Sequence, residues 1–255
     1  QAAAVPGSSL HVALDMDMQG KWHTYWTNPG DAGTETAIAW SLPEGWEASP
    51  LRQPTPERFE FQGIVSYGYH DRVVHLAELN VPAEAQPGET VRLEAAVTWL
   101  ECADICLPGE ASFTLELPVA EPGASPESVA AYTEAEAYYR EHEPIPAAQT
   151  GAQLAAWQAE EGYRLRFEPG PEMRTGLGNL YFFNSQYQSA SMSSPVSTNA
   201  PQPLERTDDG AYILTLAPSE FYTGTPERLA GILKAENPFL PERSGRGLLV
   251  DIPLQ

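Results

Sequence analysis

The sequence predicts an all-β protein of two β-sandwich domains joined by a short helical linker. Among its 255 residues, 24 Pro and 20 Gly interrupt most segments at strand length and leave little room for long helices. Several of these segments alternate apolar and polar residues, as half-buried strands do. The chain is 42% apolar and has six Trp, which is enough to fill substantial cores.

The alternation of apolar and polar residues is clearest in the first half of the chain. The strands expected there are residues 10–16, 37–42, 73–81, 91–100 and 111–119. Turn signals between them include Asn28-Pro29-Gly30-Asp31 and Gln86-Pro87-Gly88-Glu89. Strands and turns at this spacing are typical of an immunoglobulin-like sandwich. We therefore expect residues 1–120 to form one such domain, with Cys102 and Cys106 at the tip of a hairpin.

The composition changes after residue 120. Residues 121–150 are expected to be a linker with a helix over about 126–141, because Ser125-Pro126-Glu127 supplies an N-cap, a proline at N1 and an early acid. Residues 151–255 are expected to form a second, smaller immunoglobulin-like β domain without a cluster that suggests chemistry. Its expected strands are residues 163–167, 179–183, 211–216, 229–234 and 247–252, and residues 186–203 are expected to be a long loop.

Charge and motif content exclude several functions. Acidic residues outnumber basic ones 35 to 14, giving a net charge of −21, so a nucleic-acid backbone would be repelled. No apolar run approaches the roughly 20 residues of a membrane-spanning helix. Hydrolase and nucleotide-binding functions also lack support, because no catalytic-triad, nucleophile-elbow or phosphate-loop pattern is present.

The two cysteines, four positions apart, are the sharpest feature. They could be a redox pair, a structural staple, or free or metal-binding thiols. Closing so small a ring stabilises a fold by only roughly 2 kcal/mol, which a chain of this size hardly needs. Glu101 and Asp104 imply solvent access, and their charge disfavours a thiolate, so exchange would start from a partner's thiolate. We expect Cys106 to be the more exposed sulfur.

No cofactor or metal site is expected. The histidines, His11, His23, His70, His75 and His142, show no ligand spacing around the cysteines, as a zinc site would require. Two thiols could still hold Cu(I), which stays an alternative. A second alternative is a binding module in which the disulfide is purely structural.

Two aromatic segments have competing interpretations. Trp22 and Trp26 are expected on one face of a strand, filling the core, with a sugar- or peptide-binding surface as the alternative. Residues 56–63 contain Phe59 and Phe61. This segment is either an ordinary loop that packs one of them inward or a mobile aromatic lid.

Several motifs together carry a family resemblance. In order they are Trp22-His23-Thr24-Tyr25-Trp26 with Asn28-Pro29-Gly30-Asp31, Pro56-Glu57-Arg58-Phe59, Tyr67-Gly68-Tyr69, and Trp99-Leu100-Glu101-Cys102-Ala103-Asp104-Ile105-Cys106-Leu107-Pro108. Over about residues 10–120 the chain resembles the N-terminal periplasmic domain of the DsbD and ScsB family of transmembrane thiol:disulfide reductases. Three residues between the cysteines, instead of a longer insert, make it more similar to ScsB. Residues 150–255 resemble, more loosely, the second immunoglobulin-like unit of ScsB-like proteins.

The resemblance implies a thiol:disulfide oxidoreductase, the periplasmic N-terminal part of an inner-membrane protein. A reversible Cys102–Cys106 disulfide would take electrons from a thioredoxin-like domain, itself reduced through the membrane-embedded domain of the same chain. It would pass them to a periplasmic acceptor; ScsB-type proteins are linked to copper tolerance. The chain would act as a monomer on protein partners, with no nucleic acid or small-molecule substrate.

The resemblance also assigns supporting residues. A cap loop shields the disulfide in this family, and the matching residues here are Phe59, Glu60, Phe61 and Gln62, with the capping ring left open between Phe59 and Phe61. The residues expected to contact partners or support the site are Trp99, Tyr67, Tyr69, Asp104 and Pro108.

Overall fold

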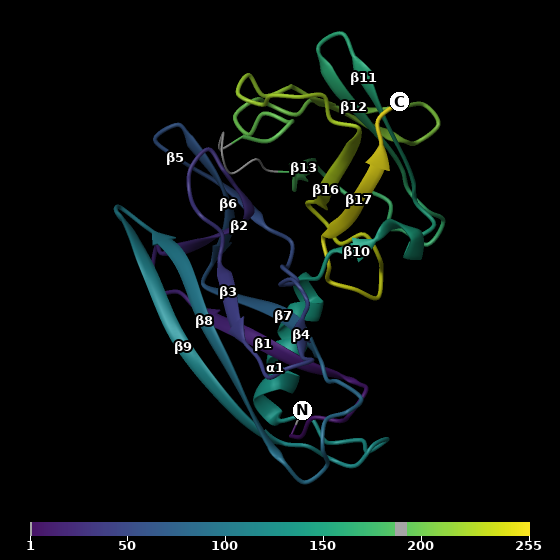
Figure 1. The fold of residues 1–255 in the computed structure, drawn as a ribbon. Coiled ribbons are helices and arrows are strands. Elements are labelled where there is room, and N and C mark those ends of the chain that lie inside the picture. The colour runs from purple at the N-terminus through teal and green to yellow at the C-terminus, as the bar shows by residue number, and fades with distance from the viewer. Residues whose placement is uncertain (1, 187–192) are drawn as a thin grey trace. The chain divides into compact units, whose positions relative to one another are not determined.

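The computed structural model describes residues 2–186 and 193–255, and strands dominate its regular structure (Figure 1). Among these residues α1 (Ala130–His142) is the one α-helix, so the all-β prediction is confirmed. The chain divides into two compact units. The first comprises Gln1–Thr24, Glu35–Pro54 and Tyr69–Arg140, and the second comprises Tyr25–Thr34, Thr55–Gly68 and Glu141–Gln255. Strands β2 (His23–Gly30) and β6 (Ile64–His70) contribute residues to both.

The first unit is a β-sandwich. One sheet has the order β1-β7-β4, formed by β1 (Ser9–Asp17), β7 (Arg72–Asn80) and β4 (Glu47–Ala48). In the other sheet β8 (Thr90–Cys102) pairs with β3 (Ala37–Ser41) along one edge and with β9 (Cys106–Pro118) along the other. All these pairings are antiparallel, as hairpin-connected strands allow.

Strand β7 separates two apolar layers because its side chains alternate between its faces. Leu79 packs between the sheets with Leu10 and Leu93. From the opposite face, Val74 and Leu76 contact the buried Ala135 and Tyr139 of α1. The helix therefore covers the outer face of the β1-β7-β4 sheet.

The second unit contains two four-stranded sheets around one core. Their orders are β10-β17-β16-β13 and β11-β12-β15-β14. The bounds are β10 (Ile145–Pro146), β11 (Gln153–Ala159), β12 (Gly162–Glu168), β13 (Leu180–Asn184), β14 (Leu204–Arg206), β15 (Tyr212–Leu216), β16 (Arg228–Ala235) and β17 (Gly247–Pro253), with a 3₁₀ turn at Ala147–Gln149. Buried residues of both sheets, such as Phe167 and Phe182, share this core.

Residues from the first half of the chain also belong to the second unit. The hairpin of β5 (Glu57–Phe61) and β6 lies there, and Trp26 and Tyr67 pack edge-on against Phe183, with ring centroids 6.3 and 4.9 Å away. The Asn28 side chain donates a hydrogen bond to the carbonyl of Asn184 (2.7 Å).

The predicted domain boundaries at residues 120 and 150 stay predictions.

The strands predicted from alternation are confirmed to within a few residues in both units. The helix is confirmed, but it starts at Ala130 rather than Pro126. Its predicted first turn, residues 126–129, is not helical, and the Glu127 carbonyl accepts a hydrogen bond from the amide of Ala2 (2.9 Å). Of the predicted loop over 186–203, residues 193–203 form no strand, and residues 187–192 lie outside the described part of the chain.

Two other expectations are corrected. Trp26 is buried in β2 as predicted, but Trp22 precedes the strand and is only half-buried, so the two do not share a strand face. Residues 57–61 form a strand rather than a loop. A two-residue turn makes this hairpin possible, because Gln62 and Gly63 both have positive φ (52° and 82°), as a type I′ turn requires.

Candidate functional site

The disulfide closes the end of the longest hairpin in the described structure. Strands β8 and β9 are paired from Thr90↔Pro118 to Cys102↔Cys106 without a bulge. The Cys102 and Cys106 Sγ atoms are bonded at 2.02 Å, and the Cα atoms are 4.1 Å apart. The three intervening residues form a tight tip, in which the Ala103 amide donates to the Ile105 carbonyl (2.9 Å). The predicted position of the cysteines at a hairpin tip is confirmed.

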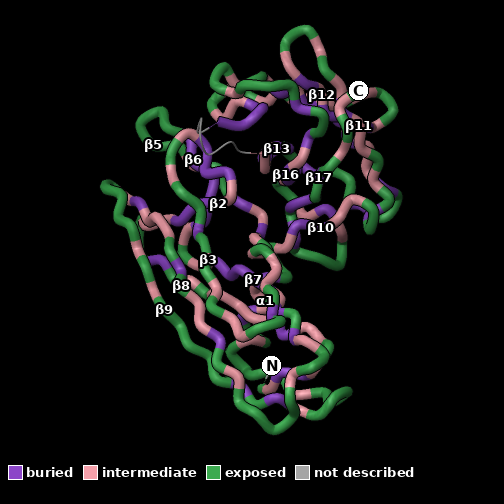
Figure 2. Tube along the Cα trace, in the orientation of Figure 1, coloured by how far each residue is buried: buried purple, intermediate pink, exposed green. Residues whose placement is uncertain are grey.

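The two sulfurs lie in different environments. Cys102 is 3% exposed, whereas Cys106 is exposed, as expected. Strand β9 is exposed along most of its length (Figure 2). Ile105 and Leu107, on either side of Cys106, are 62% and 42% exposed. An incoming nucleophile therefore reaches Cys106 before Cys102.

Sequence reasoning missed His23, which lies beside the disulfide. His23 is the register partner of Cys102, so the two side chains occupy neighbouring positions on one sheet face. Its ring centroid is 6.4 Å from that of His70. Burial, with a smaller contribution from His70, lowers the pKa of His23, so the imidazole is neutral at pH 7. No spacing rule finds this pair, because strand pairing joins residues distant in sequence.

Trp99 of β8 packs over Gly109 of β9, and this contact requires a glycine. They are register partners, and the half-buried indole of Trp99 lies over the glycine. A Cβ on Gly109 would lie 2.3 Å from Trp99 Cε2. Glycine at this position therefore lets the indole lie flat across the hairpin, three pairs from the disulfide.

The other predicted supporting residues are divided between the surface and the interior. Asp104 and Pro108 are exposed on the disulfide hairpin. Tyr67 is buried in the second unit, where its hydroxyl bonds that of Tyr181 (2.8 Å), and burial raises its pKa. Tyr69 is buried in the first unit and donates to the Pro54 carbonyl (3.0 Å). Both tyrosines are buried, and their role in supporting the site or contacting a partner stays a prediction.

The predicted cap residues lie on the β5–β6 hairpin. Phe59 is half-buried and Phe61 is 56% exposed, and they share a strand face because they are two residues apart. Glu60 is exposed, with an ion pair to Arg58 (3.3 Å), and Gln62 forms the turn. The hairpin belongs to the second unit and the disulfide to the first. Shielding of the disulfide by this hairpin stays a prediction.

Metal-binding side chains do not converge at the site. Across residues 2–186 and 193–255, no group of three or more His, Cys, Asp or Glu side chains could hold a metal ion. The Cu(I) alternative, which needs only the two thiols, stays an alternative.

The comparisons with known proteins agree with this geometry. A family model described as "Thiol:disulfide interchange protein DsbD, N-terminal" matches residues 1–118, which include the whole disulfide hairpin. Residues 1–118 belong to the DsbD N-terminal family. Together, the family and the disulfide support a thiol:disulfide exchange domain.

The fold of the chain is similar to that of a solved ScsB domain. The N-terminal periplasmic domain of ScsB from Proteus mirabilis matches with a TM-score of 0.62 and 16% identity, covering 98% of this chain and 91% of that one. The CsuC–CsuE chaperone–tip adhesion complex of Acinetobacter baumannii (TM-score 0.16, 10% identity, 92% and 100% covered) is too dissimilar to inform the fold. No curated protein matches. In the described part of the chain, no helix is long and apolar enough to cross a membrane.

Proposed function

We propose that this DsbD-family chain relays electrons between protein partners in the periplasm through a reversible Cys102–Cys106 disulfide. The donor would be a thioredoxin-like protein or domain, reduced through a membrane-embedded part of the same chain, and the acceptor a second periplasmic protein. The observation that carries the proposal is the exposed residue Cys106 at the hairpin tip, bonded to the buried Cys102. The ScsB domain similar to this chain is itself described as periplasmic.

The hairpin argues against a purely structural disulfide. Strands β8 and β9 are 13 residues long and paired throughout, so their register is already fixed by backbone hydrogen bonds. Breaking the bond frees only the tip between Cys102 and Cys106. A bridge that secures so little structure is better explained by its chemistry.

The exposure difference sets the order of bond changes. A partner thiolate attacks Cys106 Sγ, the Sγ–Sγ bond breaks, and Cys102 leaves as a thiolate that takes up a proton. The partner's second thiol loses its proton and attacks the partner's own sulfur in the mixed disulfide, and Cys106 leaves as a thiolate that takes up a proton. The partner is thereby oxidised and this domain reduced, by two electrons and two protons. The same steps in reverse reduce the acceptor.

His23 is placed to assist the buried sulfur. A thiolate formed at Cys102 is poorly solvated, because the residue is 3% exposed. The neutral imidazole on the neighbouring strand can form a hydrogen bond with the protonated sulfur and exchange its proton. We assign His23 as a positioning residue for Cys102.

The remaining assignments follow from the family resemblance. The β5–β6 hairpin, with Phe59, Glu60, Phe61 and Gln62, would shield the disulfide from small thiols. Ile105 and Leu107, with Asp104 and Pro108, would form the surface that a partner covers, since exposed apolar side chains around a reactive group favour protein docking.

Covalent trapping tests the proposal. The Cys102→Ser variant keeps the exposed sulfur, and the Cys106→Ser variant keeps the buried one. Each is activated as a mixed disulfide with thionitrobenzoate and mixed with a thioredoxin variant that lacks its resolving cysteine. Cys102→Ser should form a dithiothreitol-sensitive complex at least about tenfold faster. Equal rates, or no complex with either variant, would reject Cys106 as the exchanging sulfur.

A further inference from the structure

Strand β9 has a free edge. It pairs with β8 from Cys106 to Pro118, and in the described part of the chain it has no other strand partner. The strand is 13 residues long and exposed along most of its length (Figure 2). A long edge strand of this kind leaves a row of backbone amide and carbonyl groups available for pairing with another chain.

Hydrogen bonds at the end of β9 show which of its residues face the free edge. The amide of Val119 donates to the carbonyl of Glu89, on the β8 side (2.8 Å). The carbonyl of Pro118 instead accepts from the amide of Ala4, on the opposite side (2.9 Å). Backbone groups alternate in direction along an antiparallel strand. Between Pro108 and Pro118, the residues that direct their backbone groups to the free edge, without a backbone partner among the described residues, are Glu110, Ser112, Thr114 and Glu116.

Pro108 and Pro118 mark the ends of the usable edge. Both face the free edge by the same alternation, and neither has an amide hydrogen. Pairing with a second strand is therefore complete only over residues 110–116, and it ends short of the disulfide. Glu110 is four residues, or about 13 Å, from Cys106 along the strand, so a bound strand would leave Cys106 uncovered.

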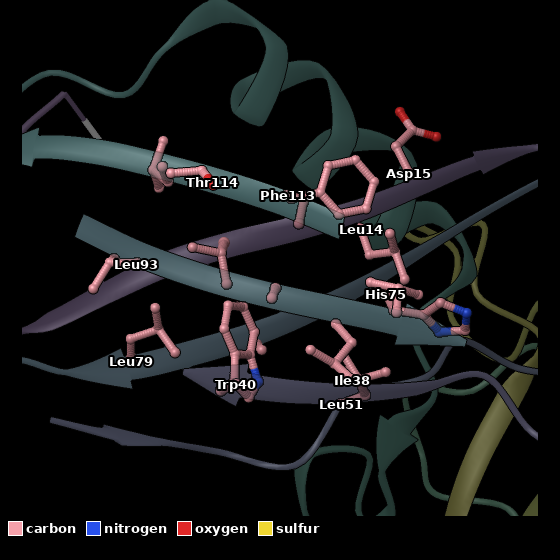
Figure 3. Close-up of a pocket in the computed structure, with 16 residues that line it drawn as sticks. Leu14, Asp15, Ile38, Trp40, Leu51, His75, Leu79, Leu93, Phe113 and Thr114 are labelled. Atoms are coloured by element: carbon pink, nitrogen blue, oxygen red, sulfur yellow. The ribbon is translucent and has the colours of Figure 1, made fainter. Parts of the chain in front are cut away.

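The inner face of this edge is apolar and only partly covered. Phe113 and Leu115 share the strand face of Leu117, which packs in the sandwich core. With Leu14 of β1, the edge strand of the other sheet, they line an apolar cavity of about 410 Å³ (Figure 3). Even so, Phe113 and Leu115 are 52% and 42% exposed. A strand paired with β9 would place its own alternate side chains beside these two and cover them.

Charge selects which strand can pair here. Glu110 and Glu116 are exposed at the two ends of the usable edge, and Arg92 offsets Glu116 only weakly, at 3.9 Å between two exposed side chains. A second copy of this chain, paired antiparallel about Phe113, would place its own Glu116 directly opposite Glu110. Like charges in that position are unfavourable, and each chain has a net charge of −21. A strand with basic residues at these two positions is attracted instead.

We propose that the free edge of β9 binds an extended segment of a partner protein, in which apolar residues alternate with polar ones between two basic residues. The segment runs antiparallel to β9, as β8 does, and becomes the next strand of the sheet. Its backbone pairs with residues 110–116, its apolar side chains cover Phe113 and Leu115, and its basic residues face the two glutamates. Because the bound partner then lies beside Cys106, the proposal names the partner class for the exchange reaction and in this respect rests on the proposed function.

A peptide without cysteine tests docking alone. The peptide Lys-Val-Thr-Val-Thr-Val-Lys, with a neutral N-terminal fluorophore, is titrated with the full disulfide-bonded chain and followed by fluorescence anisotropy. One control peptide has Glu at both ends, and another is N-methylated at both threonines, whose amides would pair with β9. In the chain, Ser112→Pro removes an amide that faces away from β8, so the β8–β9 ladder is retained. Its matched control, Ser112→Ala, removes only the hydroxyl.

The lysine-ended peptide should bind saturably, at least about tenfold tighter than the glutamate-ended one, and more weakly as salt is added. N-methylation and Ser112→Pro should each weaken binding at least about tenfold, with Ser112→Ala unchanged. The N-methylated peptide decides the outcome if Ser112→Pro does not fold. No binding, equal binding of the glutamate-ended peptide, or binding that survives N-methylation would overturn the proposal. So would a dimer of the chain alone in sedimentation velocity that Ser112→Pro abolishes, because a second copy would then occupy the edge.

Docking and exchange can fail separately. The peptide has no thiol, so its binding does not require Cys106 to exchange. Peptide binding without covalent trapping of a thioredoxin would reject the exchange reaction and retain the docking edge. Covalent trapping without peptide binding would retain the exchange reaction and reject the docking edge.

Discussion

Removing the disulfide should cost little stability. The Cys102→Ala, Cys106→Ala double variant opens a ring of only five residues, which leaves the ladder below it intact. Loop-closure entropy for such a ring amounts to about 2 kcal/mol, and this is an upper value because alanine fits the same strand positions. The double variant should therefore fold and lose at most about 2 kcal/mol of unfolding free energy.

Urea unfolding followed by tryptophan fluorescence measures this loss, with Leu93→Ala as a reference. Leu93 lies on the same strand, is 2% exposed and packs in the sandwich core, so its truncation should cost about 2–5 kcal/mol. The reference shows that the transition reports on β8. A double variant that loses more than Leu93→Ala, or does not fold, would refute the reasoning and favour a structural staple.

Three further predictions concern the same unit and its proposed cap. His75 has a folded pKa of about 4 against about 6.5 unfolded, so the unfolded state binds more protons between these values. The contribution of His75 should therefore lower the free energy of unfolding by about 3 kcal/mol as the pH drops from 6.5 to 4. Urea titrations at several pH values measure this dependence, and His75→Phe should make it less steep. An unchanged pH dependence in His75→Phe would contradict a buried, neutral His75. Gly109→Ala should cost about 1–3 kcal/mol in thermal unfolding because Trp99 must move, and a neutral effect would show that the indole is not fixed over the glycine. Phe59→Ala and Phe61→Ala should each be compared with wild type for reduction by glutathione: the capping ring is the one whose loss accelerates reduction several-fold, and no acceleration in either would reject the cap.

Local sequence patterns predicted the strands and the position of the cysteines. Alternation along residues 91–100 and 111–119 placed β8 and β9, and the short spacing between them left only a hairpin tip for Cys102 and Cys106. These features are readable because strand periodicity and turn chemistry act over a few residues.

Features that depend on distant segments were not predictable. The pairing of His23 with Cys102 joins strands far apart in sequence. Similarly, Trp26 packs on Phe183, so this segment groups with the C-terminal half of the chain. The β5–β6 hairpin was missed because its turn places Gln62, a non-glycine residue, at positive φ, which sequence patterns rarely indicate.

The reduction potential of the Cys102–Cys106 pair tests the central claim most directly. It can be measured by equilibrating the intact chain with glutathione or dithiothreitol buffers and counting free thiols. An exchanging disulfide should have a potential between about −180 and −300 mV, in the range of thioredoxin-like partners. A potential well below about −300 mV would mark an inert structural bridge and contradict the relay.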